Sequence, residues 1–331
     1  MLLWPLSLLF RLLSGLRRFA YRAVWFKSER LPVPVIVVGN ISVGGSGKTP
    51  LVIWLVEHLR AAGYTPGVIS RGYGGTEPGP FEVGPLSDPQ QVGDEPVLIA
   101  MRTDAPLFIG RKRVAAGEAL LGAHPNCDVI VSDDGLQHYA LERDVEIAVV
   151  DARVGVGNGL LLPAGPLREP VSRLSRVDAV IMNQSGGGHA TKSMDWASPG
   201  GMPWKPYSMR LSGQVFCQVR NREVHALPAD LRGRKLHAVA GIGNPARFFD
   251  YLTSLGLIFT RHSFPDHHRY TPRDLEFGAS ATILMTEKDA VKCQGFARHN
   301  CWALAVSAEL DDRFGELIVA KLRKIYGPQT A

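Results

Sequence analysis

The segment ISVGGSGKTP, residues 41–50, follows the apolar run Val33–Val38 and combines three glycines with a lysine and a threonine. Glycines let backbone amides approach phosphate oxygens where a helix begins, and a lysine and a hydroxyl group complete such a site. We therefore interpret this segment as a P-loop that binds ATP, with Lys48 at the β- and γ-phosphates and Thr49 on Mg²⁺. The candidate nucleotide-binding residues are Gly44, Gly45, Ser46, Gly47, Lys48 and Thr49.

The loop departs from the pattern G-x-x-x-x-G-K-[ST] because Ser42 stands where the first glycine is expected. Gly44 and Gly45 supply backbone flexibility nearby. A glycine-rich turn with an incidental lysine is the alternative, and the expected order of strand, loop and helix disfavours it.

A P-loop needs an acidic partner at the end of a neighbouring strand, where the carboxylate holds Mg²⁺ directly or through water. The segment CDVIVSDDGLQH, residues 127–138, runs from apolar residues into Asp133 and Asp134. Adjacent acids after a strand are also common in turns. Together with the P-loop, we interpret this pair as metal-binding residues.

Transfer of phosphate to a hydroxyl group requires a carboxylate or imidazole that accepts the hydroxyl proton. The segment GDEPVLIA offers Asp94 and Glu95, and the segment FPDHHRY offers Asp266, His267 and His268. An aspartate before Glu-Pro is also typical of a helix N-cap, and paired histidines in a polar loop are usually solvated. The residue pattern alone does not pair the two segments.

The sequence favours ATP over GTP and a kinase over a membrane-recruited P-loop ATPase. The guanine-reading pattern N-K-x-D is absent, and the nearest string is Thr286–Asp289, in which the lysine stands one place too late. The lysine that marks membrane-recruited P-loop ATPases near the start of the loop is also missing, since Val43 precedes Gly44. A kinase that acts on a hydroxyl group therefore gains support.

Strand-like runs alternate with helix-length segments, which predicts a P-loop NTPase-like α/β fold with a mostly parallel sheet covered by helices on both faces. We divide the chain into an N-terminal helix at 1–30, a P-loop domain at 31–205 and a smaller α/β domain at 206–331 joined through a β segment. Residues 184–206 are rich in Gly, Ser and Pro and indicate a loop or boundary. The predicted strands are 35–39, 67–70, 106–109, 128–132, 146–151, 179–183 and 236–240, and the predicted helices are 48–62 and 111–122.

Residues 1–26 are rich in Leu, Phe and Trp, but Arg11, Arg17, Arg18 and Arg22 interrupt them too early for a spanning helix. We predict an amphipathic helix in the membrane interface, and the alternative is a helix that packs on the protein's own core. The net charge of +6 suggests anionic partners without indicating nucleic acid, and we predict no nucleic-acid partner.

Taken together, these motifs and several others closely resemble a known family, the tetraacyldisaccharide 4'-kinases (lipid A 4'-kinases) of Gram-negative bacteria. No single motif apart from the P-loop is specific, but the whole ordered set is. Ser42 also agrees with the family, which tends to lack the first glycine of the loop. The motifs are VGNISVGGSGKTP, SRGYGG (70–75), GDEP (93–96), SDDGLQH (132–138), LLPAGPLREP (161–170), AGIGNPARFF (240–249), FPDHHRY (264–270) and TEKDAVK (286–292).

The resemblance implies transfer of the ATP γ-phosphate to the 4'-hydroxyl of an acylated glucosamine disaccharide 1-phosphate, giving lipid IVA. It also implies a peripheral location on the cytoplasmic face of the inner membrane. By motif, Asp94 is the base assisted by His267, and only the family's Asp-His string selects His267 over His268. Glu95, Asp133, Asp134 and Thr49 would serve Mg²⁺, while Arg71, Arg168 and Glu169 look like substrate-side groups. For Arg168 and Glu169, a surface ion pair after a proline turn is the alternative.

The resemblance leaves some motifs without a role and some functions open. It gives no mechanism for His138, Gly241–Gly243 or 286–292. GIGNP reads as a strand-to-helix turn with Asn244 as the helix cap and Pro245 at the first helical position. The competing functions are a membrane-associated regulatory P-loop ATPase and a soluble small-molecule kinase that would not need residues 1–26.

Overall fold

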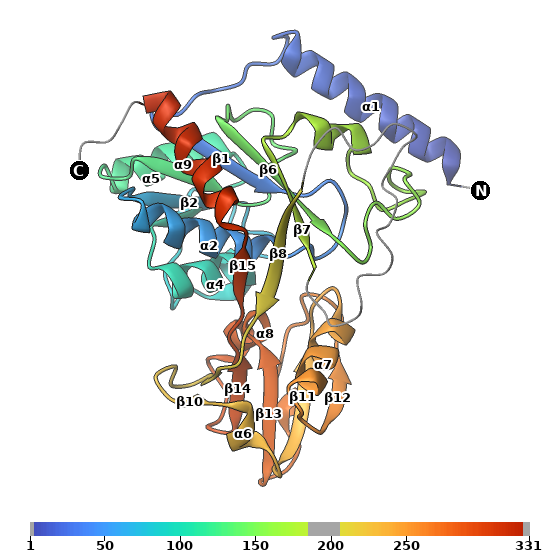
Figure 1. The fold of residues 1–331 in the computed structure, drawn as a ribbon, viewed down its shortest axis with the longest axis vertical. Coiled ribbons are helices and arrows are strands. Elements are labelled where there is room, and N and C mark those ends of the chain that lie inside the picture. Colours follow the sequence, from blue (N-terminus) through green and yellow to red (C-terminus); the bar gives the residue numbers. More distant parts are fainter. Residues whose placement is uncertain (1–2, 185–205, 327–331) are drawn as a thin grey trace.

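The computed structural model describes residues 3–184 and 206–326, which form two β-sheets with helices around them (Figure 1). The larger sheet lies beneath the N-terminal helix in this view, and the smaller sheet lies at the opposite end of the molecule. Each sheet with the helices around it is called here the larger or the smaller part, or domain, of the protein. Strands β8 (Tyr207–Ser212) and β15 (Ser307–Leu310) run from one part toward the other. The predicted α/β class with a second, smaller α/β part is confirmed.

Within the described residues the larger sheet has nine strands, and the strands from β8 to β4 are parallel to their neighbours. The two edge strands, β15 and β3, are antiparallel. Parallel order places the carboxyl ends of the strands at one edge, where α/β proteins bind ligands. In spatial order the strands are β15 (Ser307–Leu310), β8 (Tyr207–Ser212), β7 (Ala179–Asn183), β6 (Val145–Asp151), β1 (Val35–Gly39), β5 (Val129–Ser132), β2 (Pro66–Ser70), β4 (Leu107–Ile109) and β3 (Phe81–Glu82).

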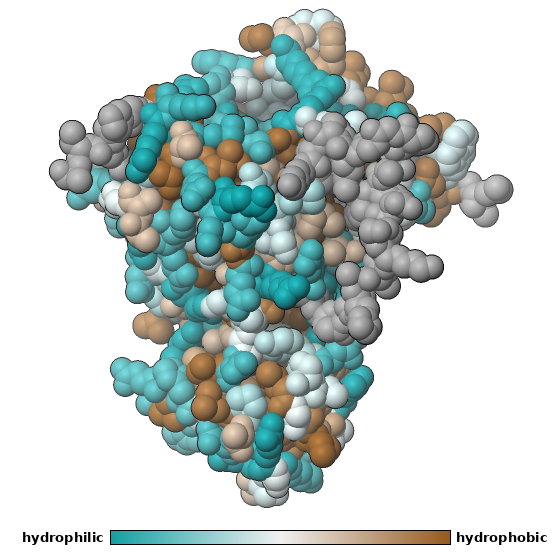
Figure 2. Space-filling view, viewed as in Figure 1, coloured by the Kyte–Doolittle hydropathy of each residue, from teal (hydrophilic) through white to brown (hydrophobic). Residues whose placement is uncertain are grey.

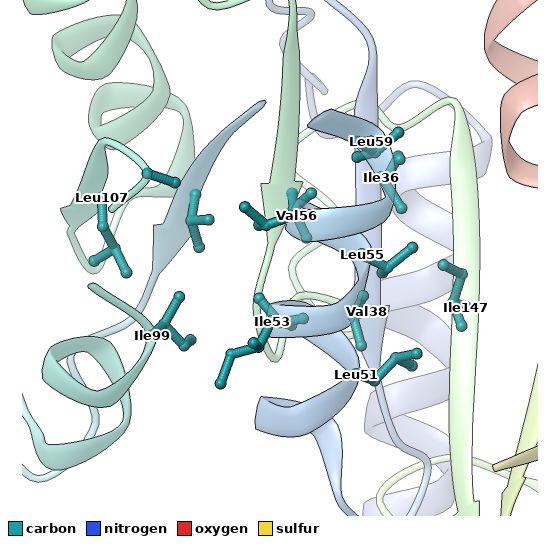
Figure 3. Close-up of a cluster of buried hydrophobic side chains, with 14 of the residues drawn as sticks. Ile36, Val38, Leu51, Ile53, Leu55, Val56, Leu59, Ile99, Leu107 and Ile147 are labelled. Atoms are coloured by element: carbon teal, nitrogen blue, oxygen red, sulfur yellow. The ribbon is translucent and has the colours of Figure 1, made fainter. Parts of the chain in front are cut away.

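Neighbouring residues of a strand point to opposite sides of the sheet, and here the residues on both sides are apolar. Helices therefore cover both faces of the larger sheet. Ile36 and Val38 of β1 pack with Leu51 and Leu55 of helix α2 (Lys48–Ala61), as Figure 3 shows. Val37 faces the other side, with α5 (Arg113–Ala123). Helices α4 (Asp94–Thr103) and α9 (Asp312–Tyr326) also contribute to the α2 side, and the short α3 spans Pro89–Val92.

The smaller sheet has six strands in the part of the chain that the structure describes, and it has its own apolar core. The strands from β14 to β12 are parallel to their neighbours, and β9 and β10 add to the β14 edge in antiparallel pairing. In spatial order the strands are β10 (His225–Ala226), β9 (Phe216–Gln218), β14 (Cys301–Leu304), β13 (Ala281–Thr286), β11 (Lys235–Ala240) and β12 (Phe259–Ser263). The helices of this part are α6 (Pro228–Leu231), α7 (Pro245–Ser254) and α8 (Glu287–Cys293).

The predicted division of the chain at residue 206 does not coincide with the division into sheets, because two strands after residue 206 belong to the larger sheet. Strand β8 pairs with β7, and β15 returns to pair with β8 in the larger sheet. Phe314 and Ile318 of α9 are buried in the core on the α2 side. The chain therefore leaves the larger sheet and comes back, an order that local sequence patterns do not reveal. Most of the predicted boundary, 185–205, lies outside the described residues.

Helix α1 (Trp4–Arg22) lies along one edge of the larger part, with its large apolar side chains in solvent (Figures 1 and 2). The side chains of Leu9, Leu12 and Leu16, which share one helix face, are more than half exposed, at 51%, 67% and 56%. Ser7 is buried and donates a hydrogen bond to the Leu161 carbonyl oxygen at 2.7 Å. In the described residues, every helix is too short or too polar to cross a bilayer.

Candidate active site

The P-loop turns at Gly47, which has a left-handed φ of +92° and immediately precedes α2. A Cβ atom at this position would lie 2.5 Å from Nδ2 of Asn183, the residue that ends β7. Asn183 Nδ2 donates to the Ser46 carbonyl oxygen at 2.9 Å and so fixes the turn. Lys48 Nζ donates to Asn40 Oδ1 at 3.2 Å. The sequence between β1 and α2 therefore forms a tight loop at a helix N-terminus, as a phosphate site requires.

The acidic pair lies beside this loop because β5, which it follows, is the parallel neighbour of β1. Lys48 Nζ is 3.4 Å from Asp134 Oδ1. Asp133 is fully buried, and burial together with the negative charges of Glu95 and Asp134 raises its pKa to about 7. The predicted P-loop and the predicted acidic pair are thus brought together, with Glu95 nearby.

The residues around Lys48 fit a divalent cation bound together with a nucleotide. No group of three or more His, Cys, Asp or Glu side chains within residues 3–184 and 206–326 is arranged to hold a metal alone. Mg²⁺ usually takes only one or two protein carboxylates and completes its shell with phosphate oxygens and water. Asp133 Oδ1 and Ser46 Oγ are buried without a hydrogen-bond partner among the described residues. The crowded carboxylates and these free oxygens therefore suit Mg²⁺.

Asp94 stands at the start of α4, where it is the first helical residue and not the cap. Gly93, with φ of +93°, takes the N-cap position, so the N-cap reading of Asp94 is wrong. Asp94 Oδ2 lies 3.2 Å from Nδ1 of His267. Asp94 Oδ1 is buried and has no hydrogen-bond partner in the described part of the chain. One oxygen is therefore fixed, and the other is available to accept a proton.

Of the two adjacent histidines in the loop of the smaller part, only His267 contacts Asp94 among the described residues. His267 adopts a left-handed φ of +57°, which turns its ring toward Asp94. His268 instead lies 3.4 Å from Asp274 Oδ2 and stacks on Phe264. His268 is thus engaged within its own part of the protein, while His267 reaches the larger part.

Electrostatics favour the ionised forms of both Asp94 and His267. Burial alone would raise the pKa of Asp94, but the hydrogen bond with His267 and the positive charges of Lys288 and Lys292 lower it below its usual range. The hydrogen bond to Asp94 raises the pKa of His267 above its ordinary value, although burial and Lys288 oppose this. Each partner therefore favours the charged form of the other.

Two lysines of the TEKDAVK motif also reach Asp94, a contact that the sequence reasoning missed. Lys288 Nζ lies 3.1 Å from Glu95 Oε1 and 3.9 Å from Asp94 Oδ1. Lys292 Nζ lies 3.9 Å from Asp94 Oδ2. Their four-residue spacing puts both side chains on one face of α8 and is the signal that could have grouped them.

The GIGNP turn also lies at the site. A Cβ atom at Gly243 would be 3.6 Å from the backbone nitrogen of Gly45, so this turn lies against the P-loop. Asn244 caps α7 by accepting a hydrogen bond from the Arg247 backbone, and Pro245 opens the helix, which confirms the strand-to-helix turn. The Arg247 side chain forms an ion pair with Asp151 at 2.5 Å. This contact ties α7 to the end of β6.

The predicted substrate-side residues differ in their surroundings. Arg168 Nη1 lies 3.2 Å from Asp134 Oδ2, next to the P-loop. Arg71 follows β2 at the same edge of the sheet and is exposed. Glu169 is 2% exposed and accepts hydrogen bonds from Tyr139 at 2.6 Å and Gln137 at 2.8 Å. Glu169 therefore stabilises the loop that carries Arg168 and does not face an open surface.

His138 contacts the buried Arg113. Arg113 is buried, and its guanidinium donates to the carbonyl oxygens of Gly110 and Asp133. His138 Nε2 accepts from the Arg113 backbone nitrogen at 3.4 Å. Burial and the charges of Arg113 and Arg143 lower the pKa of His138 to about 4. His138 is therefore neutral and acts here as a hydrogen-bond acceptor.

Comparisons with known proteins cover nearly the whole chain. The family model described as tetraacyldisaccharide-1-P 4'-kinase matches residues 1–323. Proteins named tetraacyldisaccharide 4'-kinase from Methylobacillus flagellatus and Azoarcus sp. are each 53% identical to it, covering 98% of this chain and 92% of each relative. A crystal structure of "apo" form LpxK from Aquifex aeolicus in complex with ATP has a TM-score of 0.78 at 29% identity, covering 97% of this chain and 98% of that one.

Proposed function

This chain belongs to the tetraacyldisaccharide-1-P 4'-kinase family and is an ATP-dependent 4'-kinase of lipid A biosynthesis, and we propose that Asp94 is its catalytic base. The reaction transfers the γ-phosphate of ATP to the 4'-hydroxyl of a tetraacylated disaccharide 1-phosphate. The observation that carries the proposal is the environment of the Asp94 carboxylate. Its Oδ2 is hydrogen-bonded to His267, while its buried Oδ1 has no hydrogen-bond partner in the described residues.

In this proposal Asp94 Oδ1 accepts the proton of the 4'-hydroxyl as the sugar oxygen bonds to the γ-phosphorus. The bond between the γ-phosphorus and the β–γ bridging oxygen breaks, and ADP leaves with that oxygen. His267 holds Oδ2, so that Oδ1 points at the acceptor. A carboxylate with a lowered pKa is a weak base, and its fixed orientation toward the reacting hydroxyl offsets this weakness.

The P-loop amides from Gly44 to Gly47 and the Lys48 ammonium would hold the phosphates of ATP. Thr49, Glu95, Asp133 and Asp134 would hold Mg²⁺, with Asp133 and Asp134 beside Lys48. When bound, the cation neutralises charge on the β- and γ-phosphate oxygens. Arg71 and Arg168 lie at the same edge of the sheet and would face the acceptor. These assignments are supported by proximity to the P-loop.

We further propose that α1 lies in the surface of the inner membrane on its cytoplasmic face. Its exposed leucines would enter the interface, and its arginines would meet anionic headgroups. A tetraacylated acceptor stays in the bilayer, so the enzyme must work where the lipid is. The apolar face of α1 and its contact with the larger domain through Ser7 support this placement.

The test incubates the purified protein in detergent micelles with γ-labelled ATP and tetraacyl disaccharide 1-phosphate, with and without Mg²⁺. We expect label in the lipid only when Mg²⁺ is present, and none in an acceptor that lacks the 4'-hydroxyl. Label that appears only as free phosphate, from folded protein, would contradict the proposal and favour a regulatory ATPase.

A further inference from the structure

The Asp94 carboxylate is surrounded by cations on both oxygens. Its side chain is 5% exposed, which makes an unpaired negative charge there costly. Lys288 Nζ lies 3.9 Å from Oδ1, and Lys292 Nζ lies 3.9 Å from Oδ2, the oxygen that also contacts His267. At these distances the lysines attract the carboxylate without using the lone pairs that direct hydrogen bonds would occupy.

The ammonium group of Lys292 is held in place by contacts within the smaller domain. Its ammonium lies 2.9 Å from Asp289 Oδ1 and donates to the Gly241 carbonyl oxygen at 3.4 Å. It also lies 5.0 Å from the centre of the Tyr270 ring, within reach of a cation–π contact. The side chain is 10% exposed, so these contacts leave it little freedom.

Lys288 joins the two domains at the same place. Besides Asp94 it contacts Glu95 of the larger domain at 3.1 Å and Asp266 of the smaller domain at 3.9 Å. Both lysines belong to α8, whose first turn is fixed by Thr286, which accepts a hydrogen bond from the Asp289 backbone nitrogen at 3.1 Å. The position of α8 against α4 therefore sets the position of both ammonium groups relative to Asp94.

We propose that Lys288 and Lys292 are positioning residues for phosphoryl transfer, which act through Asp94 by holding its buried carboxylate from both sides. The inference rests on the proposed role of Asp94 as base. The two lysines and His267 all come from the smaller domain, whereas Asp94 comes from the larger one. The base is therefore complete only when the smaller domain is docked against α4.

The test compares Lys288→Met, Lys288→Arg, Lys292→Met and Lys292→Arg with wild type in the lipid-labelling assay. Each Met variant should lower kcat on the order of 10- to 100-fold with little change in the KM for ATP, and each Arg variant should recover part of the loss. Lys235→Met, at the exposed start of β11, is the matched control and should keep the wild-type kcat. Thermal unfolding of every variant checks that it is folded.

The same Met substitutions are then made in an Asp94→Asn background. If the lysines act through Asp94, the combined variants should be no slower than Asp94→Asn alone. Losses that multiply, or Met variants with wild-type kcat, would overturn the inference. If Lys288→Met does not fold, Lys292→Met carries the same test, because it contacts Asp94 independently. Wild-type protein that labels no lipid would instead contradict the proposed function.

Discussion

Nδ1 of His267 lies 3.2 Å from Oδ2 of Asp94, although 173 positions separate these residues in the sequence. One residue begins a helix of the larger domain, and the other lies in a loop of the smaller domain. The contact places a partly exposed imidazole, whose pKa is raised by the hydrogen bond, behind a buried carboxylate. The proposed base therefore depends on the relative position of the two domains.

Replacing His267 tests how far the imidazole supports that base. His267→Ala removes the group that fixes Asp94 Oδ2, and we expect kcat to fall on the order of 10- to 100-fold with little change in the KM for ATP. His267→Gln, whose amide can donate to the same oxygen, should lose less activity. His268→Ala is the matched control and should retain activity. Equal losses for His267→Ala and His268→Ala would contradict the assignment.

Gly47→Ala tests the conformation of the phosphate loop without reference to activity. The left-handed φ of +92° and the 2.5 Å approach of Asn183 Nδ2 leave no room for a methyl group. We expect the free energy of unfolding to fall by about 1–3 kcal/mol, measured by denaturant titration. Gly45→Ala, whose added Cβ meets no atom within 4 Å, should cost much less. Equal costs would show that the turn is not fixed as described.

The lowered pKa of His138 predicts that the folded protein loses stability in acid. Its pKa is about 4 in the folded protein and 6.5 ordinarily, so between these values the unfolded chain binds a proton that the folded protein does not. The contribution of His138 to stability is therefore lost progressively as pH falls from 6.5 toward 4. His138→Gln, which keeps an acceptor but does not titrate, should show a shallower loss of stability over this window. Parallel pH profiles of unfolding would contradict this assignment.

The exposed face of α1 predicts membrane binding that can be removed without unfolding. The triple variant Leu9→Ser, Leu12→Ser, Leu16→Ser should reduce binding to phosphatidylglycerol vesicles on the order of 100-fold or more, because each leucine contributes apolar area to the interface. Ile258→Ser removes a side chain that is 91% exposed on the smaller domain and should bind as wild type does. Vesicle sedimentation measures both. Unchanged binding of the triple variant would contradict the role of α1.

Local patterns predicted much of the larger domain. The strand at 35–39 matches the structure to the residue, and the helix predicted at 48–62 is observed at Lys48–Ala61. The strand is marked by a run of β-branched residues, and the helix follows a P-loop. Both signals lie within a few residues of the element, so a single sequence displays them. The return of β15 and α9 to the larger sheet depends on long-range pairing and left no comparable local signal.

The site divides in the same way. Lys48 and the acidic pair were predictable because β1 and β5, parallel neighbours, end at the same edge. Only the family resemblance paired Asp94 with His267, since no periodic pattern links residues in different domains. Lys288 and Lys292 were visible as a motif, but their role depends on where α8 docks, which sequence spacing does not state.

The most direct test of Asp94 as the base is the single-turnover rate of phosphate transfer in Asp94→Asn with saturating ATP, Mg²⁺ and lipid. Asparagine keeps the shape of the side chain but does not accept the hydroxyl proton. We expect the rate to fall on the order of 10² to 10⁴-fold, with the Kd for ATP close to that of wild type. A wild-type rate, or a loss explained entirely by weaker ATP binding, would contradict the assignment of Asp94 as the base.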